Sequence, residues 1–534
     1  MNREPPGPPG HTYADPTVLA LLDGPGRPGR DVPRARQVFV NRTLRMDRIE
    51  AVGFDMDYTL ALYRLGPVEG LAFSLTRDRM VERLGYPEAV RAMRYDPDFV
   101  IRGLVMDKQT GNLFKMDRHN HVGRCFHGTR PLPADEIRRL YREEKIRLSS
   151  PRFAWLDTLF SLPEACLFAG VVDVLAEAGR PATWEKLYDD IRSTIDTVHA
   201  DGSLKALVRA DLAHFVIRDP ELGPALHKLR SGGKRLFLLT NSAWDYTDAV
   251  MRHVLDGVLP EYPSWRNYFD FAVTAARKPG FFSEKRPIEA LGPDGAVLGE
   301  AQVLERNVLY QGGSLSELER LAGFGGERVL YVGDHIYGDI LRSRRDSLWR
   351  TCMVVEELER ELAWLEGKVP ALEELARLED LRARLGDELS TRRSALNVAE
   401  RRLERGNPGP EERARLEEER RRAKAELELL RRAHRDADAR IATLGEIVEG
   451  GFNRFWGLTF KEGHENSRFG EQIEDYACVY TSRVSNLAFY SPMEYFRSAR
   501  VLMPHERAGL ALAPFGDEHA VPRAAARPSK APKP

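Results

Sequence analysis

Two carboxylates, separated by one residue, follow a short apolar run and can take different roles in breaking a phosphate ester. The run Ala-Val-Gly-Phe at 51–54 leads directly into Asp55-Met56-Asp57. A carboxylate such as Asp55 can attack phosphorus and split phosphoryl transfer into two steps. Asp57 can protonate the leaving oxygen and later take a proton from water. Taken alone, this spacing is explained as well by two solvated acids in a turn that ends a strand.

A second group of polar residues follows another apolar run. Leu-Phe-Leu-Leu precedes Thr240, Asn241 and Ser242, whose neutral donors can hold phosphate oxygens without quenching a nucleophile. Farther along the chain, Lys278 can offset phosphate charge and orient Asp55. Each feature has an ordinary alternative, because such triplets often cap helices and a lysine beside a turn is usually exposed.

A third apolar run leads into Asp334, and Asp339 follows five residues later. Mg²⁺ prefers oxygen ligands and keeps several waters. We therefore predict that Asp55, Asp334 and a backbone carbonyl near Asp57 hold Mg²⁺ beside the phosphate. The alternative is a glycine-rich turn in which Asp339 caps a helix, but it does not account for the other elements. Together, the elements favour a magnesium-dependent phosphohydrolase.

The spacing of the apolar runs predicts how these residues are positioned. Runs at 49–57, 234–242 and 328–335 have the character of buried parallel strands, each ending in polar residues. They predict an α/β fold with a parallel sheet whose one edge collects the polar residues. The stretch between the first two runs is too long for a single crossover and includes a helical pattern at 181–200. We expect an inserted cap domain there.

Composition narrows the class of protein. Of 534 residues, 42% are hydrophobic and 30% are charged, which is typical of a soluble globular protein. The net charge of −1 gives no support to a nucleic-acid partner. The four cysteines are widely separated, which argues against a disulfide framework or a zinc site. We find no secretory signal and no uninterrupted apolar stretch of membrane-spanning length, so we expect a cytoplasmic protein without a membrane partner.

The chain also divides by composition. Leucines at heptad-like steps in 356–450, interrupted by Gly-Asn-Pro-Gly-Pro at 406–410, predict an antiparallel helical hairpin. Pro- and Gly-rich or basic ends predict disorder. The predicted parts are a disordered segment at 1–36, a catalytic core at 37–62 and 219–355, an inserted cap at 63–218, the hairpin, a C-terminal segment at 451–512 that packs on the core, and a disordered tail at 513–534.

At this point the sequence resembles the haloacid dehalogenase superfamily, and more closely the cytosolic purine 5′-nucleotidases that act on inosine and guanosine monophosphates. The resemblance spans roughly 38–506, excluding much of the hairpin. It is carried by VFVNRTLRMDRIEAVGFDMDYTLALY, RGLVMDKQTGNLFKMD, LFLLTNS, ARKPGFF, LYVGDHIYGDILRSRR and YFRSARVLMPHE.

The resemblance implies a role for each residue of the predicted site. These roles are Asp55 as nucleophile, Asp57 as acid/base, Thr240 and Asn241 as phosphate holders, Lys278 as charge partner, Asp334 as magnesium ligand and Asp339 as its support. The roles agree with the chemistry of the residues. The family supplies the assignment where that chemistry alone left several choices.

Substrate selection is expected from the cap. Arg192, Asp196 and His199 fall on one helical face, followed by Lys205. A solvated Arg–Asp pair is the ordinary explanation of that spacing. The resemblance implies instead that Arg192 and Asp196 bind the purine base and that His199 and Phe160 stack near it. A guanidinium donor suits a 6-oxo group and a carboxylate suits a ring N–H, which favours 6-oxopurines.

Three positions depart from the family pattern, and one of them is Tyr337, which stands where the family has phenylalanine and could still stack. Asp157 stands where the family has asparagine, and Asp475 replaces an arginine associated with activation by nucleotides. Related enzymes are homo-oligomers, which the resemblance also implies for this chain. It equally allows the phosphate to pass to a nucleoside acceptor. The alternatives are a phosphatase acting on another small phosphomonoester, or a scaffold that acts through the hairpin.

Overall fold

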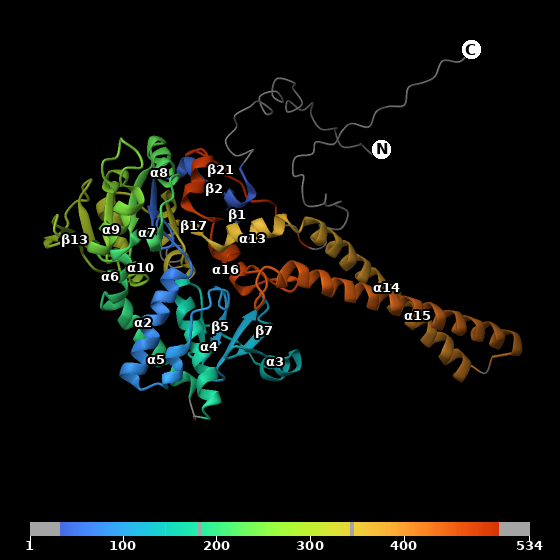
Figure 1. Ribbon diagram of the computed structural model, residues 1–534. Helices are drawn as coiled ribbons and strands as arrows, with labels where there is room; N and C mark the ends of the chain where they lie inside the picture. The colour runs from blue at the N-terminus through green and yellow to red at the C-terminus, as the bar shows by residue number, and fades with distance from the viewer. Residues whose placement is uncertain are drawn as a thin grey trace, which may run out of the picture. The chain divides into compact units, whose positions relative to one another are not determined.

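The computed structural model describes residues 32–144, 146–179, 183–341, 347–406, 408–500 and 503 (Figure 1). The chain divides into two compact units, one with residues 1–362 and 459–498 and the other with 363–458 and 499–534. The tail predicted to be disordered, and all but the last five residues of the N-terminal segment, lie outside the described residues.

A ten-stranded sheet organises the first unit. Its order is β1-β20-β17-β16-β3-β11-β12-β15-β13-β14. The strands are β1 (Phe39–Val40), β20 (Val479–Thr481), β17 (Arg350–Val354), β16 (Val329–Gly333), β3 (Ala51–Phe54), β11 (Arg235–Leu239), β12 (Phe271–Thr274), β15 (Leu309–Gly312), β13 (Ile288–Leu291) and β14 (Val297–Glu300). Pairing is parallel from β20 through β15. This topology confirms the predicted α/β fold with a haloacid dehalogenase-like parallel sheet.

The three strands predicted from the sequence lie side by side. β3 pairs in parallel with β11 on one side and with β16 on the other. All four residues of β3 are buried, as expected of an apolar strand covered on both faces. Because parallel strands share a carboxyl edge, the polar residues that follow β3, β11 and β16 meet there.

Helices α8 (Leu222–Ser231), α9 (Trp244–Leu255), α10 (Gly280–Ser283) and α11 (Leu315–Ala322) complete the core. One buried cluster is rich in aromatic rings, with Phe237 stacked on Phe271 at 5.2 Å and 12°. Gly53 on β3 faces this cluster, since a Cβ atom there would lie 2.2 Å from the Phe237 ring. Close packing of the central strand therefore depends on the missing side chain.

The predicted insertion begins and ends at one place. β4 (Leu62–Tyr63) pairs with β10 (Val216–Ile217), which closes the segment between them at its base. That segment holds α2 (Pro67–Leu84), α3 (Ala134–Tyr141), α4 (Leu162–Glu177), α5 (Trp184–Ala200), α6 (Ser203–Ala210) and α7 (Leu212–Phe215). It also holds an antiparallel sheet of β8 (Arg130–Pro131), β7 (Val122–His127), β6 (Asn112–Met116), β5 (Val105–Asp107) and β9 (Phe153–Trp155). The helix expected at 181–200 is α5.

One segment of the described chain, Leu159–Glu177, is long and apolar enough to cross a bilayer by length and composition. It was not expected from the sequence, where Pro163 and Glu164 interrupt the apolar residues. In the structure, 72% of that window is buried inside the protein, as in the core helix of a soluble protein.

Part of the C-terminal segment belongs to the first unit. β20 joins the ten-stranded sheet, and α16 (Arg468–Tyr476) contributes Phe469 and Ile473 to a buried cluster. Leu358 and Leu362 of α13 (Glu357–Glu366) lie in the same cluster. Two short antiparallel pairs are also present, β2 (Leu44–Arg45) with β21 (Tyr495–Phe496) and β18 (Lys461–Glu462) with β19 (Glu465–Asn466).

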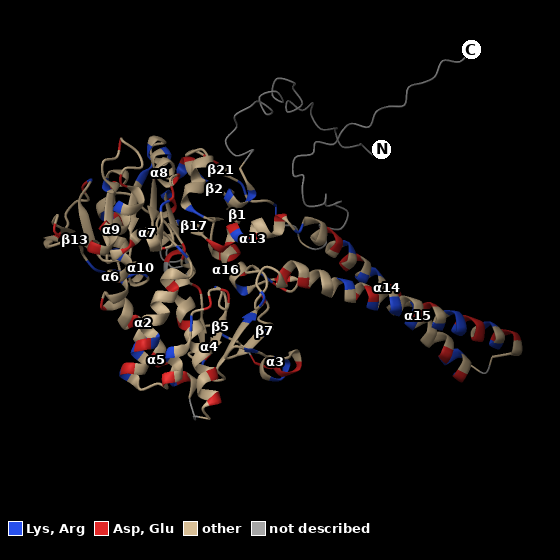
Figure 2. Ribbon diagram, in the orientation of Figure 1, with Lys and Arg blue, Asp and Glu red and all other residues tan. Residues whose placement is uncertain are grey.

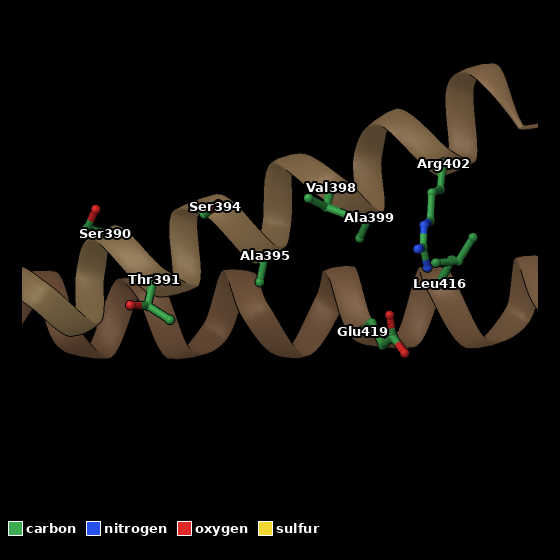
Figure 3. A pocket seen from close by; sticks show the side chains of 9 residues that line it. All are labelled: Ser390, Thr391, Ser394, Ala395, Val398, Ala399, Arg402, Leu416 and Glu419. Atoms are coloured by element: carbon green, nitrogen blue, oxygen red, sulfur yellow. The ribbon is translucent and has the colours of Figure 1, made fainter.

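The second unit contains the predicted helical hairpin. Its helices are α14 (Val369–Arg405) and α15 (Pro410–Gly445), and both signs of charge alternate along them (Figure 2). Ion pairs join the two helices, including Arg440–Glu374 at 2.8 Å and Lys424–Glu400 at 3.2 Å. Near the turn, a groove of about 560 Å³ opens between small α14 residues and Leu416 with Glu419 (Figure 3).

Replacing Gly53 by alanine tests the packing of the central strand. The added methyl group meets the Phe237 ring, so we expect the free energy of unfolding to fall by roughly 1–3 kcal/mol in urea denaturation followed by near-ultraviolet circular dichroism. Gly70→Ala in α2 is the control, because its added Cβ lies 3.7 Å from the nearest atom. Equal stability of the two variants would contradict this packing.

Candidate active site

The site centres on Lys278, whose side chain is only 3% exposed. Its Nζ lies 2.9 Å from Asp55 Oδ1 and 2.7 Å from Asp339 Oδ1, and it donates to the Tyr331 hydroxyl at 2.9 Å. Asp55 follows β3, and its backbone N–H donates to the carbonyl of Val332 on β16. A single buried cation thus joins carboxylates that follow two neighbouring strands.

Asn241 positions Lys278 through its backbone. The Asn241 amide nitrogen donates to the Lys278 carbonyl at 2.9 Å, and the Lys278 N–H donates to Asn241 Oδ1 at 2.6 Å. The chain reaches Lys278 through Ala275 and Arg277 in the left-handed region, with φ of 47° and 60°. Both ends of the Asn241 amide are therefore engaged, whereas sequence analysis expected this side chain to hold phosphate.

Burial and like charge dominate the electrostatics of the acidic groups. Burial raises the pKa of Asp55, Lys278 opposes that shift, and Asp339 adds to it. Burial, assisted by Asp339, raises the pKa of Asp334 to about 7. For Lys278, burial lowers the pKa, but Asp339 and Asp55 outweigh it and leave the pKa well above its usual value. The lysine stays charged, but the three carboxyl groups, if all were ionised, would carry more negative charge than it offsets.

A cation would relieve this excess. Asp55, Asp334 and Asp339 each offer a carboxylate oxygen, and these oxygens lie within 4.8 Å of one another. Asp334 Oδ2 is buried without a hydrogen-bond partner among the described atoms. Gly333 permits the close approach of Asp339, because a Cβ atom on it would lie 2.7 Å from the Asp339 Cβ. An all-oxygen donor set with an unpartnered oxygen fits a hard divalent cation.

Asp57 has different surroundings and lies outside that carboxylate group. Its Oδ1 accepts from the Tyr63 hydroxyl at 2.6 Å and its Oδ2 from the Ser242 hydroxyl at 2.7 Å. Tyr63 in turn lies 2.9 Å from the Tyr246 hydroxyl. Neutral donors hold this carboxylate, whereas a cation holds Asp55. Sequence analysis missed both tyrosines, although Tyr63 belongs to the same motif as the carboxylates.

Thr240 directly follows β11 and is fully buried. Its hydroxyl oxygen accepts from the Ser242 N–H at 3.1 Å, and its own N–H donates to the Val273 carbonyl. Ser242 therefore turns back toward Asp57. The polar triplet predicted from the sequence lies at the carboxyl edge with Asp55 and Asp334, but its three members have separate partners.

Cap residues extend the site away from the carboxylates. The Phe160 ring, 38% exposed, packs edge-on against Tyr58 at 4.9 Å and against His199 at 5.9 Å. Lys205 Nζ lies over the Tyr246 ring and 3.4 Å from the Ser242 hydroxyl. Residues of the insertion thus contact the residues that surround Asp57.

The three residues predicted to contact the base from one helical face all lie on α5. His199 Nδ1 donates to the Ile195 carbonyl at 2.8 Å, and burial lowers the pKa of His199. A neutral ring bonded in this way presents Nε2 as an acceptor. Arg192 contacts Asp196 at 3.2 Å and also Glu164 at 2.8 Å. Glu164 is buried, and sequence analysis missed it because it stands among the apolar residues of α4.

Among the departures from the family pattern, Asp157 reaches the site. Its Oδ2 lies 3.0 Å from His335 Nε2. Burial lowers and Asp157 raises the pKa of His335, and the balance places it at about 9. Asp475 lies in α16, on the C-terminal segment.

With this geometry in place, comparisons with known proteins identify the family. A family model with the description "5′ nucleotidase family" matches residues 38–508. The chain belongs to the 5′ nucleotidase family. Membership confirms the resemblance to 5′-nucleotidases seen in the sequence and makes the protein a 5′-nucleotidase, a phosphoric monoester hydrolase.

Individual relatives agree. A 5′-nucleotidase domain-containing protein of Dictyostelium discoideum is 30% identical over 480 residues, which cover 88% of this chain and 75% of that protein. The rat 5′-nucleotidase domain-containing protein 2 is 33% identical over 399 residues, covering 70% and 69%. A solved 2-haloacid dehalogenase from Pseudomonas syringae pv. Tomato DC3000 is 19% identical, with a TM-score of 0.20 and coverage of 57% and 86%. The fold assignment here rests on the sheet topology.

Replacing Lys278 by methionine tests the central ion pairs. Two buried carboxylates lose their cation, so we expect the metal-free protein to lose roughly 3–5 kcal/mol of unfolding free energy. Adding Asp339→Asn should restore part of that loss, because one of the unpaired charges is then removed. If Lys278→Met unfolds at the same urea concentration as the wild type, the ion pairs do not stabilise the site.

Proposed function

We propose that this 5′-nucleotidase hydrolyses purine nucleoside 5′-monophosphates, with inosine or guanosine monophosphate preferred, through a phosphate ester of Asp55 that requires Mg²⁺. The observation that carries the proposal is the contrast between two carboxylates of one turn. Asp55 is held by Lys278 beside two further acids, and Asp57 is held by hydroxyl donors. One is suited to attack and the other to proton transfer.

The residues that would hold Mg²⁺ are Asp55 and Asp334, with Asp339 beside them. The predicted backbone carbonyl near Asp57 completes the proposed set. When bound, the ion offsets the charge of the carboxylates and of the substrate phosphate and polarises the phosphoryl oxygens.

The first half-reaction begins at Asp55. Its Oδ1 accepts from the Met56 N–H at 2.8 Å and from Lys278, which leaves Oδ2 to attack phosphorus. The bond between phosphorus and the 5′ oxygen breaks, and Asp57, in its protonated form, donates a proton to that oxygen. In the second half-reaction, Asp57 takes a proton from water as the water oxygen attacks phosphorus. Asp55 is released as a carboxylate, and phosphate leaves.

Residues around the carboxylates would hold the phosphate. Thr240, Asn241 and Ser242 lie at the same strand edge, and Lys278 and Lys205 supply positive charge on two sides. Because the Asn241 amide is engaged by Lys278, we assign its contribution to placing that lysine. A nucleoside hydroxyl that replaces water in the second step would make the enzyme a phosphotransferase.

Purine selection would come from the cap. Phe160 offers an aromatic face, and His199 offers a neutral acceptor. Arg192 can donate to a 6-oxo group, and Asp196 can accept from a ring N–H. Buried Glu164 holds one side of the Arg192 guanidinium, and Asp196 contacts the other, so both base-binding candidates lie together. We further propose a cytoplasmic enzyme that assembles as a homo-oligomer and has no membrane or nucleic-acid partner.

Replacing Asp55 by asparagine should abolish the reaction. The amide cannot form the phosphate ester, so phosphate release from a panel of nucleoside monophosphates should fall at least about 10³-fold. Chelation of Mg²⁺ should stop release by the wild type in the same assay.

Other outcomes of that assay separate the alternatives. Release from other phosphomonoesters alone would keep the mechanism and remove the purine assignment. No release from any substrate by the folded wild type would contradict the proposal and favour the hairpin scaffold.

Replacing Arg192 by alanine should change selectivity. With the donor lost, kcat/KM for inosine monophosphate should fall about 10–200-fold while that for cytidine monophosphate changes little. Arg91→Ala is the matched control, because that cap arginine pairs with Glu82 and Glu88 at the surface. A uniform loss across all substrates would show that Arg192 does not read the base.

A further inference from the structure

Arg102 and Asp157 flank the inserted sheet at the same end. β5 and β9 pair antiparallel, and the pairing continues past them through Leu156 N–H to Leu104 carbonyl and Gly103 N–H to Leu156 carbonyl. Arg102 precedes this pairing on one strand and Asp157 follows it on the other. The sheet therefore fixes both side chains relative to one another.

Arg102 binds the backbone of a predicted metal ligand. Its side chain is fully buried, and Nη1 donates to the Asp334 carbonyl at 2.9 Å. The other side of the guanidinium binds both carboxylate oxygens of Glu357 and lies over the Phe469 ring at 5.2 Å. Gly103 admits that ring, since a Cβ atom there would lie 2.6 Å from the Phe469 Cβ. The guanidinium thus has one orientation.

Asp157 binds the next residue along the same loop. Its carboxylate contacts His335 Nε2 at 3.0 Å, and the His335 N–H lies 3.4 Å from Asp339 Oδ2. Consecutive residues of the loop are therefore held from one sheet end, one through its carbonyl and one through its ring. Among the described atoms, Asp334 Oδ2 is buried without a hydrogen-bond partner, so no such bond fixes the direction of that oxygen.

We propose that Arg102 and Asp157 are positioning residues for the metal site, a sheet-end pair through which the insertion sets the direction of the Asp334 carboxylate. The inference rests on the proposed magnesium-dependent function. Groups that orient metal ligands from outside typically change metal affinity by about 10–100-fold when replaced. The insertion would then do more than bind the base, because its folded sheet also completes the metal site.

Calorimetric titration of Mg²⁺ into the nucleotide-free protein tests the pair. Arg102→Met and Asp157→Ala should each weaken Mg²⁺ binding about tenfold or more, and the Mg²⁺ concentration for half-maximal phosphate release should rise in parallel. Asp157→Asn keeps an acceptor for His335 and should restore most of the affinity. Because Arg102→Met leaves the partly buried Glu357 without its cation, Asp157→Ala is the second variant that keeps the test decisive if the first does not fold.

The control is Arg152→Met. Arg152 holds Asp107 through two hydrogen bonds at 2.8 and 2.7 Å, at the other end of β5. The Arg152→Met substitution should lower thermal stability and leave Mg²⁺ affinity unchanged. If Arg102→Met and Asp157→Ala both bind Mg²⁺ as tightly as the wild type, the positioning role of the pair is overturned while the proposed function stands. A wild type that neither binds Mg²⁺ nor releases phosphate would overturn both.

Discussion

The arrangement of the site depends on one buried cation, Lys278, between the carboxylates of Asp55 and Asp339. A charge taken out of water is costly unless it is paired, so the surrounding structure must deliver both carboxylates to the lysine. The parallel pairing of β3 and β16 delivers them, and the Asn241 amide fixes the backbone from which the lysine extends. The donor set of Asp55, Asp334 and Asp339 fits a divalent ion, whose charge would offset that of the carboxylates and of a phosphate.

The insertion depends on the same edge of the sheet. Its paired ends, β4 and β10, return the chain beside Tyr63, whose hydroxyl holds Asp57. Phe160 and Lys205, from later parts of the insertion, contact Tyr58 and Ser242 of the core. A turn of three residues thus holds Asp55, which the core fixes, and Asp57, which lies where core and insertion meet.

Much of this could be predicted from the sequence, and the limits have a physical cause. Apolar runs that end in Asp55, Thr240 and Asp334 predict a shared edge, because parallel strands align their carboxyl ends. Partners chosen by three-dimensional packing leave no local pattern. The use of the Asn241 amide by Lys278, the burial of Glu164 behind Arg192, and the bond from Arg102 to the Asp334 carbonyl each join residues far apart in the chain.

The central claim is that Asp55 carries the phosphate, and chemical trapping tests it most directly. The enzyme is mixed with inosine monophosphate and Mg²⁺, quenched in acid and reduced with borohydride, which converts an aspartyl phosphate to homoserine. Peptide mass spectrometry should then find homoserine at position 55 in the wild type and none when substrate is omitted. Rapid turnover with phosphate found on another residue, or with no trapped residue under conditions that trap a known aspartyl phosphate, would contradict the account.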